Sequence, residues 1–449
     1  MRGPRGWGSV RSVGRRTRGG VARNLAPGTS YGFTIRKRLA RGYGKWYRTR
    51  SVRLPPRPTA PFVQPLDEVA PVAGGIPTLT VDTAGGAPIV SKDDYLNATY
   101  SLSGNADPAR DVSGTTEIKG RGNSTWDRPK KPYRLKLSAK QPLFGFPSSR
   151  HWVLLANHYD KSRIRNAIAM HLGRQTGLAW TPRDHFVRLR LNGVDAGLYE
   201  LFEHVRVDPD RIAIDELKAT DNSGAALTGG YQFERDGWTP GPDEQQFHSP
   251  RDIPFTFKNP EAPTTAQWSF IDEYVGDAED AIYAGSGYED YIDVDSWIDW
   301  YIVCELLKNQ DAGYSSVNYY KPRGGKIFMG PLWDFDQSLG GSGWGSNTTS
   351  GWWVRDGLGG GRLDNEYFHE LFNDPVFAAK FRARWIELEP KLKSIYSFVD
   401  SLGYWLAPDA VSDGQLWPGS VDFAAQLQFI KNWLAARFDW IDANLPPAT

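Results

Sequence analysis

Three oxygen-bearing side chains in the second half of the chain have the types and spacing that suit phosphoryl transfer. Asp311 closely follows an apolar stretch, Asn318 comes seven residues later in a strand-like run, and Asp334 follows after sixteen more, within Trp333-Asp-Phe-Asp336. Carboxylates beside aromatic and apolar neighbours are costly to desolvate unless a metal or another cation compensates their charge. These residues indicate a metal or catalytic site, and a structural hydrogen-bond cluster is the alternative.

Phosphoryl transfer also needs groups that cradle phosphates, and a glycine-containing turn supplies candidates. Arg121 and Asn123 lie in the run Gly120-Arg-Gly-Asn-Ser-Thr-Trp126. In a tight turn, backbone N–H groups are free to meet an anion. Glycine turns also form without any ligand, so this turn alone has a purely structural alternative.

Basic residues follow on the next predicted strand. Lys131, Arg134 and Lys136 all lie within Lys130-Lys-Pro-Tyr-Arg-Leu-Lys136. Arg134 and Lys136 are two residues apart, which places both on one face of a strand. That face either meets phosphates or is an ordinary solvated surface.

The elements that must position these residues change from mainly β to mainly α along the chain. Alternating apolar residues predict strands, and Asn192-Gly193 predicts a type I′ hairpin between two of them. After about residue 265, apolar residues recur at helical spacing. The expected strands cover 76–83, 97–102, 117–119, 133–137, 186–191, 197–203, 230–234, 317–320 and 326–329, and the expected helices cover 160–177, 268–284, 294–309, 365–372, 375–393 and 421–444.

Composition excludes several classes of protein. The 449 residues contain 53 basic and 52 acidic side chains, so overall charge gives no argument for a nucleic-acid or anionic-membrane partner. The single Cys304 excludes an intramolecular disulfide and a Cys-based zinc site. No run of 18 apolar residues occurs, and no His-Glu-x-x-His motif supports a zinc enzyme.

Several motifs in one order resemble the CotH kinase family, the spore coat protein H type. They are Lys119-Gly-Arg-Gly-Asn-Ser-Thr-Trp126 with Lys130-Lys-Pro-Tyr-Arg-Leu-Lys136, Trp152-Val-Leu-Leu-Ala-Asn157 with Asp160-Lys161 and Arg165-Asn166, Leu191-Asn-Gly193 with Gly197-Leu-Tyr199, and Trp333-Asp-Phe-Asp336. The resemblance implies an α+β, atypical protein-kinase-like fold with two lobes, a β-rich N-lobe and a helical C-lobe, with ATP between them.

The resemblance also implies a role for each candidate residue. Asp311 is similar to the catalytic base, and Asn318 and Asp334 are similar to the metal ligands. Lys136, or Lys131 in its place, is the expected phosphate lysine, beside Arg121 and Asn123. The predicted helix 160–177 contains no Glu to pair with that lysine. Glu203 is therefore the expected partner, and Asp336 departs from the Gly of an Asp-Phe-Gly element.

The N-terminal end differs from this body. Residues 1–53 contain fifteen basic residues and no acidic one. The run Asn24-Leu-Ala-Pro-Gly-Thr-Ser-Tyr31 resembles the tyrosine corner of a fibronectin type III domain, and a truncated gene model would explain why only its last part is present. The expected organisation is a disordered basic segment at 1–20, partial fibronectin type III-like strands at 21–54 as a short all-β remnant, a Pro-rich linker at 55–75, the N-lobe at 76–260 and the C-lobe at 261–449.

The implied activity is transfer of the ATP γ-phosphate to Ser/Thr-type hydroxyls of proteins, the kinase itself included, with Mg²⁺ or Mn²⁺. Protein substrates are the expected partners, with no nucleic acid and no transmembrane segment, and the chain is expected to be a monomer. An extracellular, cell-surface or spore-surface location in a bacterium is expected, with the export signal lost by truncation. The alternatives are a catalytically inactive kinase-fold adhesion or scaffold protein, and a kinase-fold enzyme that transfers AMP or glutamate instead.

Overall fold

The computed structural model describes residues 76–241, 243–341, 347–356, 366–417 and 422–447, together with the backbone of six short strands between residues 2 and 53. The chain forms two compact units, Met1–Phe62 and Val63–Thr449. The predicted disordered segment 1–20 and Pro-rich linker 55–75 lie outside the described residues, apart from two short strands near the N-terminus.

The N-terminal unit contains three antiparallel strand pairs. The pair β4–β5 forms a hairpin in which Leu39 pairs with Gly42. The predicted tyrosine corner lies mostly outside the described residues. The strands are β1 (Arg2–Gly3) with β2 (Gly6–Trp7), β3 (Ser30–Tyr31) with β6 (Val52–Arg53), and β4 (Thr34–Leu39) with β5 (Gly42–Arg48).

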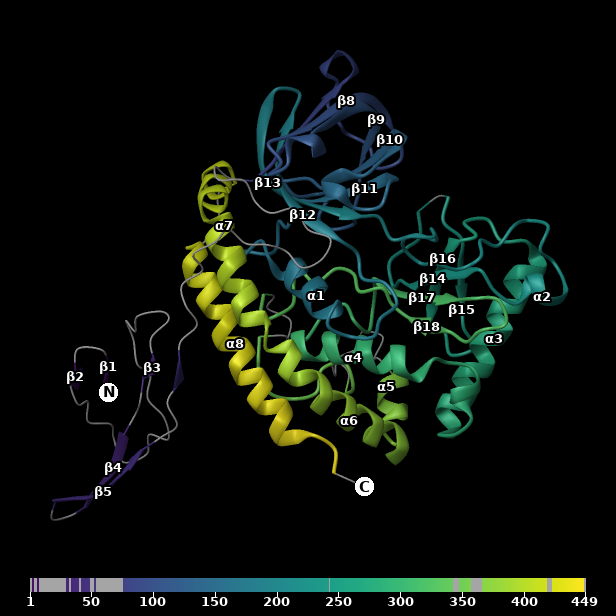
Figure 1. Ribbon diagram of the computed structural model, residues 1–449. Helices are drawn as coiled ribbons and strands as arrows, with labels where there is room; N and C mark the ends of the chain where they lie inside the picture. Colours follow the sequence, from purple (N-terminus) through teal and green to yellow (C-terminus); the bar gives the residue numbers. More distant parts are fainter. Residues whose placement is uncertain are drawn as a thin grey trace. The chain divides into compact units, whose positions relative to one another are not determined.

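The larger unit begins with a closed seven-stranded barrel (Figure 1). The strands follow the order β10-β11-β13-β12-β7-β8-β9 around it, and only the β12–β7 pair is parallel. Closure leaves no free sheet edge, so all seven strands have partners on both sides. The strands are β7 (Thr78–Thr83), β8 (Leu96–Ser103), β9 (Val112–Gly120), β10 (Tyr133–Gln141), β11 (Ser149–Leu155), β12 (Asp184–Leu191) and β13 (Val194–Glu203).

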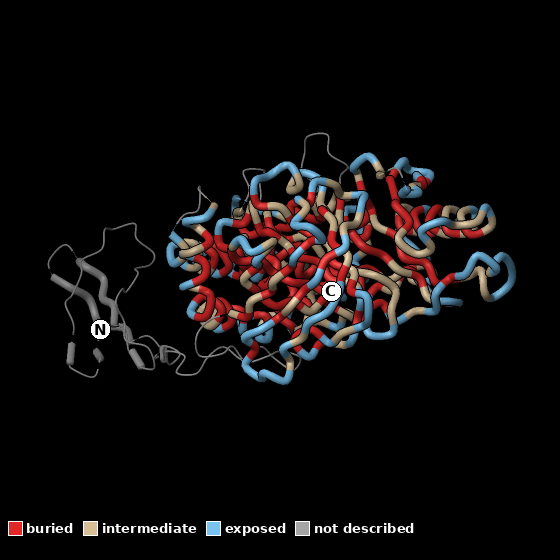
Figure 2. Tube along the Cα trace, turned by 90° about the horizontal axis from the view of Figure 1, so that it is seen from above, coloured by how far each residue is buried: buried red, intermediate tan, exposed pale blue. Residues whose placement is uncertain are grey.

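Alternation along these strands sorts the side chains into the barrel core and its outer surface. On β10, Tyr133, Leu135 and Leu137 are buried in the core, whereas Arg134 and Lys136 point outward. The β12–β13 hairpin confirms the predicted type I′ turn, since both Asn192 and Gly193 have positive φ, 51° and 77°. The side chains inside the barrel form a single apolar cluster. Figure 2 shows that buried positions are concentrated inside the larger unit.

A second sheet of five strands and a set of helices form the rest of the unit, as the predicted change from β to α requires. The sheet has the order β15-β16-β14-β17-β18. It includes strands from both sides of the expected lobe boundary at residue 260, because β14 pairs with both β16 and β17. Its strands are β14 (Tyr231–Arg235), β15 (Gln246–His248), β16 (Pro254–Asn259), β17 (Val317–Lys321) and β18 (Phe328–Met329). The helices are α1 (Arg165–Gly173), α2 (Gly224–Leu227), α3 (Thr265–Ala284), α4 (Val294–Leu307), α5 (Glu366–Leu371), α6 (Pro375–Leu392), α7 (Ile395–Leu416) and α8 (Phe423–Asn444), with short 3₁₀ turns at Ala84–Gly86, Pro108–Arg110, Leu143–Gly145 and Tyr288–Asp290.

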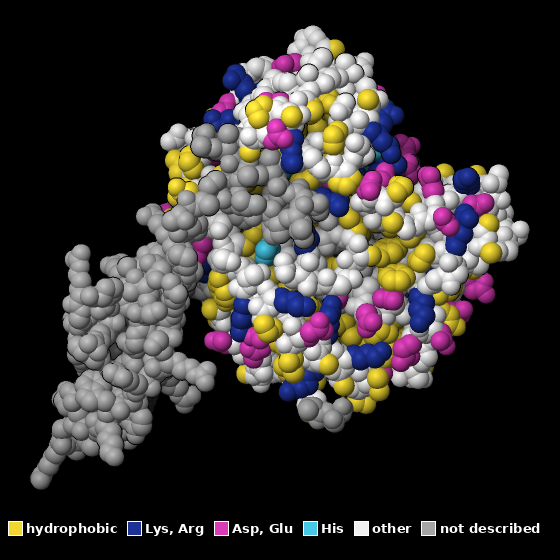
Figure 3. Space-filling model, viewed as in Figure 1, with side chains coloured by type: hydrophobic (Ala, Val, Ile, Leu, Met, Phe, Trp, Pro, Cys, Tyr) yellow, Lys and Arg dark blue, Asp and Glu magenta, His cyan; other side chains and the backbone are white. Residues whose placement is uncertain are grey.

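The surface of this unit carries charges of both signs. On the face in Figure 3, Lys and Arg side chains alternate with Asp and Glu. In the described part of the chain, no helix combines the length and apolar character needed to cross a bilayer.

Helix α7 was not expected from the sequence, yet it ties the helical part to the barrel. Its Asp413 is fully buried and accepts hydrogen bonds from Lys130 Nζ at 2.7 Å, Arg163 Nε at 2.9 Å and the Leu198 N–H at 2.9 Å. Burial lowers the pKa of Lys130 to about 8 even with Asp413 beside it. This carboxylate therefore balances two cations in the interior.

We expect Asp413→Ala to destabilise the protein strongly, because Lys130 and Arg163 would stay buried without their counter-charge. Removal of one partner from a buried pair typically costs about 3–5 kcal/mol. Urea unfolding should show this loss. The control is Asp400→Ala on the same helix, whose partly exposed pair with Lys431 should cost less than about 1 kcal/mol. Equal effects of the two substitutions would contradict the structural role of Asp413.

Candidate active site

The segment after β18 brings Asp334 to the barrel. The guanidinium of Arg121 lies 5.6 Å from the ring centre of Trp333. The Trp333 ring also packs edge-on against Phe202, on the outer face of β13, with 5.6 Å between the ring centres. Asp334 itself has a φ of 62°, in the left-handed region that residues other than glycine seldom adopt. Such a conformation persists only where the surroundings enforce it.

Three residues around α1 enforce it. The side-chain oxygen of Asn166 accepts a hydrogen bond from the Phe335 N–H at 2.7 Å, and Arg165 Nε donates to the Ser338 carbonyl at 2.8 Å. Asp160 pairs with Arg165 and also accepts from its backbone N–H at 2.8 Å. All three are buried, so they hold the segment from Asp334 to Ser338 as a rigid turn.

Three other carboxylates, those of Asp334, Asp311 and Asp160, lie within electrostatic range of Asp336 at this turn. Burial raises the pKa of Asp336 well above its usual value, and Asp334, Asp311 and Asp160 raise it further. Burial also raises the pKa of Asp334, against the opposing effect of Arg121. The structure thus places Arg121 near Asp334, and Asp311 and Asp334 near Asp336. Such a concentration of negative charge favours a bound cation.

Asp311 lies in the turn that follows α4, a helix buried on all sides. Its N–H donates to the side chain of Asn309 at 3.1 Å, and its carbonyl accepts from the N–H groups of Tyr314 and Ser315. These bonds fix the backbone of Asp311 at the C-terminal end of a buried helix.

Asn318 lies on β17, directly opposite Glu234 of β14. Residues opposite one another in an antiparallel pair project from the same face. Glu234 raises the pKa of Asp334, so this face of the sheet approaches the carboxylates. Ser316, the residue just before β17, donates a hydrogen bond to Asp334 Oδ2 at 3.4 Å. Asn318 and Asp334 therefore lie in one neighbourhood.

The predicted phosphate lysine pairs with a carboxylate on the adjacent strand. Lys136 Nζ lies 2.9 Å from Glu117 Oε2, directly across from it on β9, and both side chains are about a third exposed. Glu203, the expected partner, is instead buried against Arg183 at 3.2 Å and Arg211 at 3.8 Å. Burial raises the pKa of Glu203 despite these two arginines.

Lys131 and Asn123 belong to the glycine turn. Lys131 Nζ donates to the Trp126 carbonyl at 2.6 Å and lies 4.6 Å from the centre of that indole, so it closes the turn. Asn123 is exposed, and its carbonyl accepts from the Trp126 N–H. Neither contact reaches the carboxylates.

The outer barrel face opposite the carboxylates is strongly basic. Arg134 lowers the pKa of Arg121 and, together with burial, that of His151 and His204. Burial is the largest cause, and the pKa of His151 falls to about 3. Both imidazoles are therefore neutral near pH 7, and the positive charge of this face comes from arginine and lysine.

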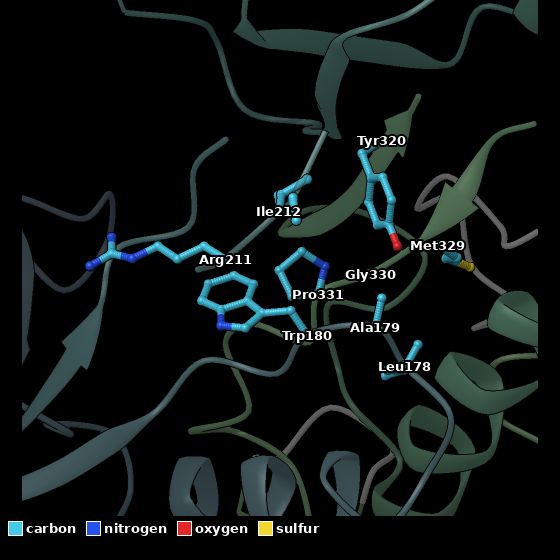
Figure 4. Close-up of a pocket in the computed structure, with 10 residues that line it drawn as sticks. Leu178, Ala179, Trp180, Arg211, Ile212, Tyr320, Met329, Gly330 and Pro331 are labelled. Carbon is cyan, nitrogen blue, oxygen red and sulfur yellow. The ribbon is translucent and has the colours of Figure 1, made fainter. Parts of the chain in front are cut away.

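A cavity of about 90 Å³ lies elsewhere, between the loop after α1, the connection from β13 to β14, and the β17–β18 hairpin (Figure 4). Its walls are mainly apolar, with Trp180, Ile212 and Pro331 facing one another, and the guanidinium of Arg211 points away. None of the predicted site residues lines it. The carboxylate turn, rather than this cavity, is therefore the candidate active site.

A metal ion would need ligands from more than one residue type. In the ranges that the structure describes, no three His, Cys, Asp or Glu side chains are grouped closely enough to hold an ion. Mg²⁺ commonly takes only one or two protein carboxylates and completes its shell with water and substrate phosphates. Asp334, Asp336 and Asn318 fit that kind of site.

Several functional residues were not assigned roles from the sequence. Asp160, Arg165 and Asn166 belong to quoted motifs, but only the structure joins them to the turn at Asp334. Glu117 was missed because the alternation of β-strand positions between core and surface does not reveal which strand is adjacent. An apolar helix that begins with Arg-Asn was the available signal, since such polar residues are rarely fully buried without partners.

Asn166→Ala should loosen the turn, because the Phe335 N–H would lose its buried acceptor. Loss of one such bond costs about 1–3 kcal/mol, so amides of residues 332–339 should exchange roughly tenfold faster or more. Hydrogen exchange followed by mass spectrometry measures this. Asn123→Ala is the matched control and should leave the exchange of that peptide unchanged. Unchanged exchange in Asn166→Ala would contradict the role of the clamp, that is, of the hydrogen bonds by which Asn166 and Arg165 hold residues 334–338.

Comparison with known protein families agrees with this geometry. The family model described as CotH kinase protein matches residues 118–441, which cover most of the chain. No fibronectin type III match accompanies it, so that interpretation of residues 21–54 has no support. No curated protein matches the chain. Membership of this family implies a kinase that uses ATP and suggests protein substrates. The match spans the barrel strands from β9 onward, the carboxylate turn and the helices, and the chain belongs to the CotH kinase family.

Proposed function

We propose that this protein is an ATP-dependent protein kinase that phosphorylates Ser/Thr-type hydroxyls of proteins, its own chain included. The observation that carries the proposal is the convergence of Asp311, Asp334 and Asp336 beside Arg121 under a basic barrel face. Carboxylates facing cations suit the binding of a metal and a polyphosphate. The barrel and the helical part then correspond to the two lobes of an atypical kinase.

Asp311 is the catalytic base in this proposal. It accepts the proton of the acceptor hydroxyl while the hydroxyl oxygen forms its bond to the γ-phosphorus. The bond from that phosphorus to the β,γ-bridging oxygen breaks, and ADP leaves. The backbone bonds of Asp311 to Asn309, Tyr314 and Ser315 support this role, because they keep its position constant during the transfer.

Asp334, Asp336 and Asn318 are the proposed ligands of Mg²⁺ or Mn²⁺. The cation would neutralise phosphate charge during transfer. Burial raises the pKa of both aspartates, and Asp334 raises that of Asp336 further; this supports the assignment, because a bound cation would stabilise both carboxylates in their charged form. The clamp from Asn166 and Arg165 would hold these ligands in place.

Arg121 and Lys136 are the proposed phosphate contacts. Arg121 is the nearer of the two to the carboxylates, since it opposes the raised pKa of Asp334. Lys136 pairs with Glu117, which we propose as the carboxylate partner of the phosphate lysine in place of Glu203. Arg134 lies between them on the same strand face and adds to the positive potential. Lys131 and Asn123 contribute by shaping the glycine turn.

The substrate proteins, a monomeric state and an extracellular or surface location remain part of this proposal. They rest on the family resemblance. A scaffold without activity and an enzyme that transfers AMP or glutamate are the competing possibilities, and they differ in the products formed from ATP.

Asp311→Ala and Asp334→Ala should each lower phosphate transfer to casein by about 100-fold or more, the usual contribution of a positioned acid–base group or metal ligand. The assay uses γ-labelled ATP with Mn²⁺ or Mg²⁺. Asp277→Asn, an exposed carboxylate of α3, is the control and should retain full activity.

Product analysis separates the alternatives in the same assay. ADP with labelled protein supports the kinase. AMP attached to protein, or glutamate attached to protein when glutamate is added, would show a different transfer reaction in place of the proposed kinase activity. Binding of ATP without any turnover would support the inactive scaffold protein instead.

Glu117→Gln should raise KM for ATP by roughly tenfold while the free energy of unfolding stays within about 0.5 kcal/mol, because the Lys136 pair is partly exposed. Glu203→Ala should instead destabilise the fold by about 3 kcal/mol or more, since it leaves buried Arg211 unpaired. ATP kinetics and urea unfolding of both variants test this division. An effect on KM from Glu203→Ala alone would restore Glu203 as the lysine partner.

A further inference from the structure

The described residues 347–356 form a segment that follows the Asp334 turn in sequence and packs on α4 and α8. Thr348 is exposed in this segment. Its Oγ1 accepts a hydrogen bond at 3.2 Å from Lys308 Nζ, which also donates to the Ser350 carbonyl at 2.5 Å. An accessible hydroxyl is thus held against a lysine ammonium.

Lys308 is a buried cation without a carboxylate of its own. It is 2% exposed, and no described carboxylate lies within ion-pair distance of it. The nearest acid, Glu305, already pairs with Arg437 at 2.5 Å and accepts backbone N–H groups from the segment, including those of Trp353 and Val354. Burial, together with the charge of Arg437, lowers the pKa of Lys308 to about 8 against the opposing effect of Glu305. Among the described residues, the Thr348 hydroxyl is the only side-chain oxygen that contacts the ammonium.

The same segment, residues 347–356, also contacts the turn that contains Asp311. Lys308 adopts a left-handed conformation, with φ of 47°, at the end of α4. The indole N–H of Trp353 donates to the Asn309 carbonyl at 2.7 Å, and the Asn309 side chain accepts from the Asp311 N–H. A change of charge at Thr348 therefore acts on a short hydrogen-bonded path to Asp311.

We propose that Thr348 is an autophosphorylation site and that Lys308 is the preformed counter-charge for its phosphate. This inference rests on the proposed function. The Thr348 Oγ1 would attack the γ-phosphorus of ATP, its proton would pass to Asp311, and ADP would leave. The product carries close to two negative charges at pH 7 and three acceptor oxygens within reach of an ammonium that has no acid partner.

Phosphorylation at this position orders the segment. The phosphate replaces a weak hydroxyl acceptor with a charge-assisted one, and it gives the buried ammonium an ion-pair partner. Through Trp353 and Asn309, that order extends to the backbone of Asp311. The phosphorylated protein is therefore the more active form, by roughly 5- to 150-fold, the usual range for coupling between two sites.

The test uses the full chain incubated with ATP and Mn²⁺, followed by intact-mass measurement and phosphopeptide mapping. We expect phosphate on Thr348, its loss in Thr348→Ala and its return in Thr348→Ser. Thr99→Ala, an exposed threonine of β8, is the matched control and should not change the pattern at Thr348. Casein labelling by phosphorylated and phosphatase-treated protein then measures the gain in activity.

Lys308→Gln and Lys308→Arg test the counter-charge. Phosphorylation should raise the melting temperature of the wild-type and Lys308→Arg proteins but not that of Lys308→Gln. Equal shifts in all three would overturn the role of Lys308. Casein labelling without phosphate on Thr348 would overturn this inference and leave the proposed kinase intact, whereas a protein with no transferase activity would end both.

Discussion

The arrangement of the active site depends on the attachment of one turn, residues 334–338, to the buried polar residues around α1. Asp334 has a backbone conformation that an aspartate does not adopt by itself, and the bonds from Asn166 and Arg165 keep it there. Asp160 supports Arg165 in turn. Because these groups are buried, each would carry a desolvation penalty if the turn moved away. The turn and α1 are therefore stable only together, and this keeps two acidic side chains close in a site of low polarity.

Electrostatics explains why such a site is built between a basic and an acidic surface. Burial raises the pKa of Asp334 and Asp336, and Asp334 and Asp311 raise the pKa of Asp336 further. Arg121 opposes the rise at Asp334, and a bound cation would oppose it at both carboxylates. Burial, reinforced by nearby arginines, lowers the pKa of His151 and His204, so the positive charge of the barrel face comes from arginine and lysine.

Buried ion pairs also connect the parts of the larger unit. Asp413 of α7 balances Lys130 and Arg163, and Glu305 of α4 balances Arg437 of α8. Pairs of this kind are costly when one member is missing, so they favour one arrangement of the helices against the barrel. Lys308 is an exception among the buried cations near the site, since a threonine hydroxyl and a carbonyl replace the acid.

The sequence by itself determined the change from β to α, most strand positions and the Asn192-Gly193 hairpin, because these follow from local periodicity and turn chemistry. The roles of Asp311 and Asp334, which rest on motif spacing and family resemblance, stay predictions. It did not reveal α7, whose Gly403, Pro408 and Gly414 are typical of helix ends rather than of a helix interior, and which is stabilised by packing and by Asp413. The pairing of Lys136 with Glu117 rather than Glu203 was decided by which strands lie side by side in the barrel. The same holds for Asn166, whose partner is 169 residues away, since a contact at that separation exists only after the chain has folded.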